Sequence, residues 1–316
     1  MTACVIGADQ TRWTLPKLLA WRLEYTAGVP CDSFWVRCAW DVDNTARPED
    51  WVRFEAEYEG ERVFTGVVDE CEVSITAQGR VLEVSGRGMA ALLLDNEALG
   101  QDYQIATQKD IVRDHVRPYG ISVASGTELR AVSQFSVSTG SSEWSVVYEF
   151  ARYYGGVAPR FDREGRLVLA GWDDRTERLV DDSAPLISLT RRDRRYGVLS
   201  QVLVRDRWSG MVETLDNKEF TAAGGQARRI ITMPERSTYK DMRYSGAFQL
   251  DKSASEWKRM EVTVGQPICV WPGELVTVRR SGLDWNGQYR AVEVTVGMDM
   301  GGRWSRMVLA PPDFTV

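Results

Sequence analysis

The sequence predicts a mainly β protein in which an α+β segment separates two β-rich regions. Apolar and polar residues alternate with a period of two near both ends of the chain, and the period changes to helical between about residues 100 and 185. At roughly 150 residues per domain, the 316 residues correspond to about two domains. A chain of this length buries on the order of 75% of its unfolded surface and needs no disulfide to stabilise it.

The first β region is predicted to be a meander of short antiparallel strands. Residues 20–25 and 51–58 alternate between apolar and polar side chains, which is typical of half-buried strands. After them, Ser85–Gly86–Arg87–Gly88 predicts a tight turn into a short helix rich in alanine and leucine. Further strands of the meander are expected at 62–68, 72–76 and 80–84.

The middle segment contains two predicted helices with recognisable starts. Thr107 and Asp110 form a capping-box pattern, and the helix they begin is expected to stop before Pro118. A second helix is capped by Ser142 and ends at Gly155 and Gly156. One face of it is apolar, through Trp144, Val147, Tyr148 and Ala151, and strands are expected to follow at 157–161 and 166–169.

The C-terminal region is predicted to be β-rich. Residues 173–185 are interpreted as a loop, and residues 251–259 fit either a helix or a loop. Pro272–Gly273 predicts a type II turn and Asn286–Gly287 a tight hairpin turn. Strands are expected at 198–204, 211–214, 227–232, 260–264, 274–279, 289–296 and 304–309.

Composition excludes several classes of protein. The net charge of −6 disfavours general binding to nucleic acid or anionic lipid, and no apolar run approaches the ~20 residues of a membrane span. Residues 1–13 have no secretory or transit pattern. The five cysteines include no Cys-x-x-Cys pair and there is one histidine, so we expect free thiols, no zinc site and no cofactor.

No catalytic constellation emerges from the motifs. His115 is the obvious candidate for acid–base chemistry, but the chain has no Gly-x-Ser-x-Gly elbow to accompany it. The acid pairs Asp173–Asp174 and Asp181–Asp182 lie among turn formers, where carboxylates are usually solvated. Ser85–Gly86–Arg87–Gly88 lacks the remaining residues of either phosphate-binding fingerprint. We therefore expect no catalytic, metal or cofactor residues.

The densest charge cluster is Arg191, Arg192, Arg194 and Arg195, which the pattern places immediately before a strand. Three interpretations are open: a solvated face, a contact with acidic residues of a neighbouring subunit, or a nucleic-acid contact. The tryptophans Trp257, Trp271, Trp285 and Trp304 fall in or beside predicted turns, where they suit core packing, an interface or a sugar platform.

The order of four stretches resembles a known family. Residues 29–34 place a proline and a small acidic turn before a strand, and residues 79–95 form a strand, a glycine–arginine turn and a short helix ending in an acid. A helix at 142–156 precedes a hairpin at 161–169, and residues 271–278, 284–292 and 304–309 complete the pattern. In this order the chain is similar to the baseplate hub proteins of phage tails, the Mu-type hub and late control protein D group.

This resemblance implies two similar β-barrel domains flanking a small α+β domain, with boundaries at 1–98, 99–185 and 186–316 and an insertion around 215–260. It implies a non-enzymatic homotrimer that joins a sixfold tail tube, or its initiator, to a threefold spike. DNA would pass through without specific binding, and the protein would not insert in a membrane itself. The implied location is the baseplate of the virion tail, after assembly in the bacterial cytoplasm. The four arginines are then expected at the subunit interface.

Two other classes of function stay open at this point. A carbohydrate-binding β protein of the tail tip would use exposed tryptophans such as Trp271, Trp285 and Trp304. A cell-wall hydrolase would need a lysis domain, and no such extension follows the last predicted strand.

Overall fold

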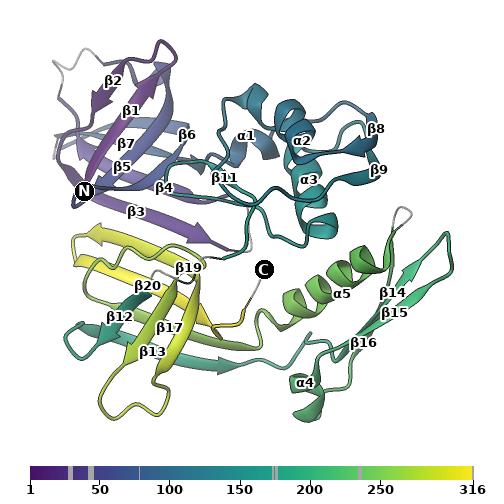
Figure 1. Ribbon diagram of the computed structural model, residues 1–316. Coiled ribbons are helices and arrows are strands. Elements are labelled where there is room, and N and C mark those ends of the chain that lie inside the picture. The colour runs from purple at the N-terminus through teal and green to yellow at the C-terminus, as the bar shows by residue number, and fades with distance from the viewer. Residues whose placement is uncertain are drawn as a thin grey trace.

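The computed structural model describes residues 1–27, 31–41, 46–77, 79–172, 174, 177–233 and 237–314. Strands dominate it, and along the chain an α+β segment separates two β-rich parts, so the predicted fold class is confirmed. Figure 1 shows this segment at the upper right, beside the first of the two parts. Val29, Pro30 and Asp173, which the sequence singled out, lie outside the described residues.

The first β module, at the upper left of Figure 1, is built from the first seven strands. Strand β6 merges two predicted strands, because a bulge between Val68 and Glu70 lets the chain continue along β7 instead of turning. The elements of the module are β1 (Thr2–Gly7), β2 (Arg12–Thr14), β3 (Leu18–Thr26), β4 (Ser33–Ala39), the 3-10 turn η1 (Pro48–Asp50), β5 (Trp51–Tyr58), β6 (Glu61–Thr76) and β7 (Gly79–Gly88).

The middle segment packs its helices around a separate apolar core. Both predicted caps are confirmed: Thr107 and Asp110 form a capping box, and the Ser142 hydroxyl accepts from the backbone N–H of Ser145. Its elements are α1 (Ala91–Leu94), β8 (Gln101–Ala106), α2 (Gln108–His115), the 3-10 turn η2 (Arg117–Tyr119), β9 (Val132–Val137), α3 (Glu143–Tyr148), the π-helical turn η3 (Glu149–Tyr154), β10 (Arg160–Phe161) and β11 (Leu167–Val168).

The second β module occupies the lower left of Figure 1. The prediction of a loop over 173–185 is wrong, since β12 runs through it, pairs in parallel with β18 and buries Val180 completely. The backbone N–H of Glu274 donates to the carbonyl of Trp271, which confirms a turn centred on Pro272 and Gly273. The strands are β12 (Glu177–Asp181), β13 (Leu186–Asp193), β17 (Lys258–Val264), β18 (Leu275–Arg279), β19 (Gly287–Asp299) and β20 (Gly302–Ala310).

The hairpin predicted at Asn286–Gly287 is confirmed, since β18 and β19 pair antiparallel there, but the tight turn expected for it is wrong. Val278 pairs with Gly287, and the longer connection between them is closed by the Asn286 side chain, which accepts from the backbone N–H of Arg280 and donates to its carbonyl. Asparagine therefore acts here through its side chain, and not as a residue with positive φ.

An insertion separates β13 from β17 and forms a small sheet covered by one long helix, at the lower right of Figure 1. Residues 251–254, left undecided by the sequence, end that helix. Its apolar residues form no single stripe because it packs on the insertion sheet through Met242 and on the middle segment through Phe248. The elements are β14 (Gln201–Asp206), β15 (Val212–Asp216), α4 (Lys218–Ala222), β16 (Arg228–Met233) and α5 (Tyr239–Ala254).

The two β modules share one strand order. The first runs β3-β4-β7-β6-β5-β1 and the second β13-β17-β20-β19-β18-β12, so each places its strands in the same sequence, with β2 as an extra edge. One difference is direction: β1 is antiparallel to β5, whereas β12 is parallel to β18. Corresponding bulges lie between Leu18 and Ala20 and between Leu186 and Ser188, and again between Val68 and Glu70 and between Ala291 and Glu293.

The modules are joined edge to edge by β3 and β19. These strands pair antiparallel from Thr26 opposite Glu293 to Trp21 opposite Met298, so the modules belong to one thirteen-stranded sheet. No closed barrel forms among the described strands, which differs from the barrels that the family resemblance implied. The physical reason is that β2 and β13, at the ends of this sheet, each pair on one edge only.

Asp32, in the connection from β3 to β4, makes stability depend on pH. Its carboxylate accepts from the backbone N–H of Thr26 at 3.0 Å. Burial raises the pKa of Asp32 from 3.8 to about 7. The folded chain thus holds the proton more tightly than the unfolded chain, and this contribution to stability is complete below about pH 4 and lost as the pH rises through about 7.

We expect the variant Asp32→Asn to be more stable than the parent at pH 8, by on the order of 2 kcal/mol, and equal to it at pH 4. Thermal melts at both pH values check this, and the acid measurement serves as the control. A variant that is less stable at pH 8 contradicts the raised pKa.

Candidate subunit interface

The arginine cluster lies on an edge strand. Arg191 and Arg192 lie near the end of β13, directly before its last residue Asp193, and Arg194 and Arg195 follow the strand. The prediction that the cluster precedes a strand is therefore wrong. The strand escaped notice because most of its side chains are exposed, so it has little of the apolar alternation that identifies a half-buried strand.

The four guanidinium groups differ in what they contact. Arg191 lies 5.8 Å from the ring of Trp285, and Arg195 lies 5.2 Å from the ring of Phe220 and donates to the carbonyl of Ala223. Arg192 and Arg194 are exposed, and neither makes an ion pair with the part of the chain that the structure describes. Two of the four are thus held by ring contacts or a hydrogen bond, whereas Arg192 and Arg194 are exposed, and Arg192 acts on the chain through its charge near Glu261.

The backbone of β13 offers unused hydrogen-bonding groups. Within the described ranges this strand pairs only with β17, from Leu186 to Asp193, which leaves its other edge open. An open edge is a template for a further strand. Leu186 and Ile187 on this strand are 41% and 63% exposed, so the edge also carries apolar surface.

A second open edge lies on β6. This strand pairs with β5 only up to Val67, whereas its pairing with β7 continues to Thr76. Residues 70–75 therefore have a strand on one edge only among the described residues. They include exposed acids, Glu70 and Glu72, and two apolar side chains, Val73 and Ile75, that are 44% and 73% exposed.

His115, the candidate for acid–base chemistry, lies in a buried hydrogen-bond network. His115 is 4% exposed; its Nδ1 lies 2.6 Å from Glu143 Oε2 and its Nε2 3.1 Å from the Tyr103 hydroxyl. The Tyr119 hydroxyl donates to the other Glu143 oxygen at 2.8 Å. This buried network ties α2 to α3 and satisfies the polar groups within the core.

Ser85–Gly86–Arg87–Gly88 is part of β7, so the predicted tight turn is wrong. A Cβ on Gly86 would lie 2.0 Å from the Val67 carbonyl oxygen, which shows why glycine is needed where β6 and β7 approach at the bulge. Arg87 donates to both Asp69 and Asp95, and these hydrogen bonds raise the pKa of the guanidinium. Its charge is thus already neutralised within the chain.

The remaining acids cap loops. Asp181 accepts from Ser183, and Asp182 accepts from Ser281; these hydrogen bonds lower the pKa of both carboxyls. Asp174 lies beside Arg290, at 2.8 Å. The described residues contain no cluster of three or more potential metal ligands. No helix among them combines the length and apolar character needed to cross a bilayer.

The tryptophans do not share one open face. Trp257 is buried, and Trp271 lies 4.5 Å from Tyr25 between the two modules. The indole of Trp304 donates to Asp299 within its own hairpin. Among the described tryptophans, Trp208 has the most exposed side chain, at 69%, and sequence patterns did not single it out.

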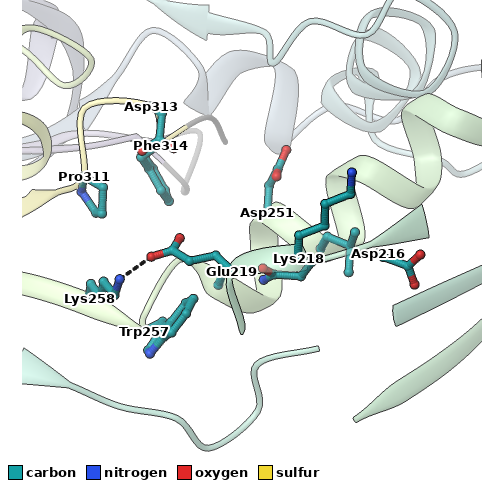
Figure 2. A pocket seen from close by; sticks show the side chains of 12 residues that line it. Asp216, Lys218, Glu219, Asp251, Trp257, Lys258, Pro311, Asp313 and Phe314 are labelled. Atoms are coloured by element: carbon teal, nitrogen blue, oxygen red, sulfur yellow. Dashed lines mark hydrogen bonds and ion pairs between the residues drawn. The ribbon is translucent and has the colours of Figure 1, made fainter. Parts of the chain in front are cut away.

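A pocket of about 420 Å³ lies between the insertion and the C-terminal segment. Figure 2 shows Lys258 paired with Glu219, with Trp257 below the pair and Phe314 above it. Both acidic and basic groups line it, and Glu219 and Lys258 are already paired with each other. The pocket therefore favours no particular class of ligand.

Comparisons with known proteins agree with this architecture. The family model described as "Baseplate hub protein gp44-like, second domain" matches residues 90–171. No curated protein matches the sequence.

Solved structures match over nearly the whole chain. The 43 kDa tail protein of prophage MuSo2 from Shewanella oneidensis is 17% identical with a TM-score of 0.78, covering 100% of both chains. A tail protein from Neisseria meningitidis MC58 is 15% identical with a TM-score of 0.79, covering 99% of this chain and 96% of its own. The E. coli c3393 protein, described as a type VI secretion component with similarity to T4 tail proteins gp27 and gp5, is 12% identical with a TM-score of 0.59, covering 93% and 73%.

At these identities the structural matches establish the fold. Residues 90–171 match the second-domain family of gp44-like baseplate hub proteins, and the whole chain shares the fold of the two tail proteins from Shewanella oneidensis and Neisseria meningitidis.

Proposed function

We propose that this protein is a structural baseplate hub, in which three copies form a ring of six β modules between a sixfold tail tube and a threefold spike. The observation that carries the proposal is the repeated strand order of the two modules, joined by β3 and β19 within one chain. Two similar modules per chain let a threefold assembly present six similar faces, which is what a junction between sixfold and threefold partners needs.

In this role the chain divides into three domains. Residues 1–98 and 186–316 hold the two modules, and residues 99–185 the α+β domain that the gp44-like match largely covers. β12 pairs with β18 and so functions with the second module, although it lies before residue 186. The insertion expected around 215–260 starts earlier than predicted, because the small sheet between β13 and β17 begins with β14 at Gln201 and α5 ends at Ala254.

The role is mechanical and requires no reaction. A net charge of −6 suits the wall of a conduit, because such a surface does not attract phosphates and lets DNA pass. Its partners are then further copies of the chain, the tube or its initiator, and the spike. Its place is the virion tail, after assembly in the host cytoplasm.

Electron microscopy of the protein mixed with its tail components tests the proposal. We expect closed rings with three chains and six similar densities around the axis. A light-scattering mass of the purified assembly checks the copy number. A ring of another copy number, or a chain that joins the tail as a single copy, contradicts the symmetry role.

A further inference from the structure

We infer that β13 of one copy pairs antiparallel with residues 70–75 of β6 in the next copy, with Arg192 opposite Glu72 and Arg194 opposite Glu70. This inference rests on the proposed trimer and names the surface that builds it. The internal joint between β3 and β19 supplies the template, because β13 corresponds to β3 and β6 corresponds to β19 in the repeated strand order.

The bulges fix which residues of β13 and β3 correspond. In the first module Leu18 pairs with Cys38 and, after the bulge, Ala20 pairs with Arg37. In the second module Leu186 pairs with Val264 and, after the bulge, Ser188 pairs with Thr263. Ser188 therefore takes the place of Ala20, Leu189 that of Trp21, Arg192 that of Glu24 and Arg194 that of Thr26.

The hairpins fix the correspondence of β6 and β19 in the same way. Thr76 pairs with Gly79 at the end of one hairpin, and Asp299 pairs with Gly302 at the end of the other. Counting back to the bulge in each strand, Glu70 takes the place of Glu293. It follows that Glu72 takes the place of Thr295, and Ile75 that of Met298.

Applying the register of the β3–β19 pair to β13 and β6 then fixes which residues of the two copies lie opposite one another. Within the chain, Thr26 lies opposite Glu293, Glu24 opposite Thr295 and Trp21 opposite Met298. Between chains, the same register puts Arg194 opposite Glu70, Arg192 opposite Glu72 and Leu189 opposite Ile75. Opposite charges and two apolar side chains thus meet directly, although charge played no part in the alignment.

The pairing also satisfies the two open edges. β13 and residues 70–75 of β6 each lack a strand on one edge within the described ranges, and both carry exposed apolar side chains. Ser74 falls opposite Thr190, so hydroxyls face each other between the charged and the apolar pairs. Because each copy offers one edge of each kind, the contact is heterologous, and such a contact forms the proposed ring when the rotation between neighbouring copies is about 120°.

Disulfide trapping tests the register. Opposite residues in an antiparallel pair have Cα atoms about 4.5–5.5 Å apart, within the range that a disulfide spans. We expect Ser74→Cys with Thr190→Cys, in a Cys71→Ser background, to give a covalent trimer on oxidation at rising protein concentration. A mixture of the two single variants is expected to stop at a dimer, and the background variant alone serves as the control.

The outcomes separate this inference from the proposed function. Trimers by mass without this disulfide, or with a faster disulfide in the shifted pair Ser74→Cys with Arg192→Cys, overturn the strand pairing and leave the trimer intact. A dimer from Ser74→Cys alone points to an isologous contact and overturns the inference as well. If the protein forms neither a trimer nor this disulfide at its highest soluble concentration, both the strand pairing and the proposed trimer are overturned.

Charge reversal supplies a second test that needs no cysteine. Glu72→Arg and Arg192→Glu are each expected to weaken trimer formation roughly tenfold or more, because each places like charges opposite one another. The two changes combined are expected to restore it. Arg117→Glu, an exposed reversal in the middle segment, is the control and should leave the assembly unchanged. Failure of the double variant to recover contradicts the predicted opposition of these two residues.

Discussion

Replacing Phe54 by alanine is expected to lower the free energy of unfolding by about 3–5 kcal/mol. Phe54 is fully buried on β5 and stacks on Phe34 with ring centroids 3.7 Å apart and planes 6° from parallel. The ring of Phe64 lies 6.1 Å away at 65°. The change removes the centre of this aromatic cluster. Phe34 and Phe64 cannot move in to fill the cavity, because they lie on β4 and β6, each of which pairs with strands on both edges.

Urea denaturation followed by tryptophan fluorescence measures this loss. The matched control is Val52→Ala on the same strand, where the side chain is 41% exposed, and its effect is expected to stay below about 1 kcal/mol. Equal effects at the two positions would show that the cluster is not the centre of the first module's core.

Replacing Arg290 by methionine is expected to cost about 2–3 kcal/mol and to release the C-terminal segment. Arg290 is 5% exposed, and its guanidinium donates twice to the Pro312 carbonyl, at 2.9 and 2.7 Å. It also donates to the Gly273 carbonyl at 2.7 Å and to Asp174 at 2.8 Å. Methionine preserves the apolar stem but leaves these acceptors without a donor.

Thermal unfolding and hydrogen exchange at the backbone amides of Asp313 and Phe314 check this second expectation, since Pro311 and Pro312 carry no amide hydrogen. Arg303→Met, on the exposed side of β20, is the control and should change neither measurement. Stability that falls while exchange at the C-terminus stays slow would contradict the role of Arg290 in holding that segment.

Local chemistry was the part of the fold that the sequence predicted well. The capping box of Thr107 and the turn at Pro272 depend on a few neighbouring residues, and β5 matches its predicted bounds, 51–58. By contrast, β12 and β13 owe their existence to pairing with strands far along the chain, and β13 has almost no buried face. Their formation depends on tertiary hydrogen bonds that leave little trace in local alternation.

Of the two strand edges in the candidate interface, the sequence drew attention only to the one that carries the arginines. Four arginines in five residues stand out in any sequence, and a contact with acidic residues of a neighbour was among the interpretations they allowed. Glu70 and Glu72 do not stand out among the 45 acidic residues of the chain. Only the strand register, with its paired bulges, connects those acids to the arginines.

The contact between β3 and β19 also has a consequence for biosynthesis. β3 ends at Thr26, yet the strand that covers its outer edge ends at Asp299. At roughly 5–20 residues per second, the ribosome adds the intervening chain over tens of seconds, during which this side of β3 stays uncovered. The nascent protein thus exposes an unpaired strand edge for most of its translation. Slowing elongation should increase its aggregation and its dependence on chaperones.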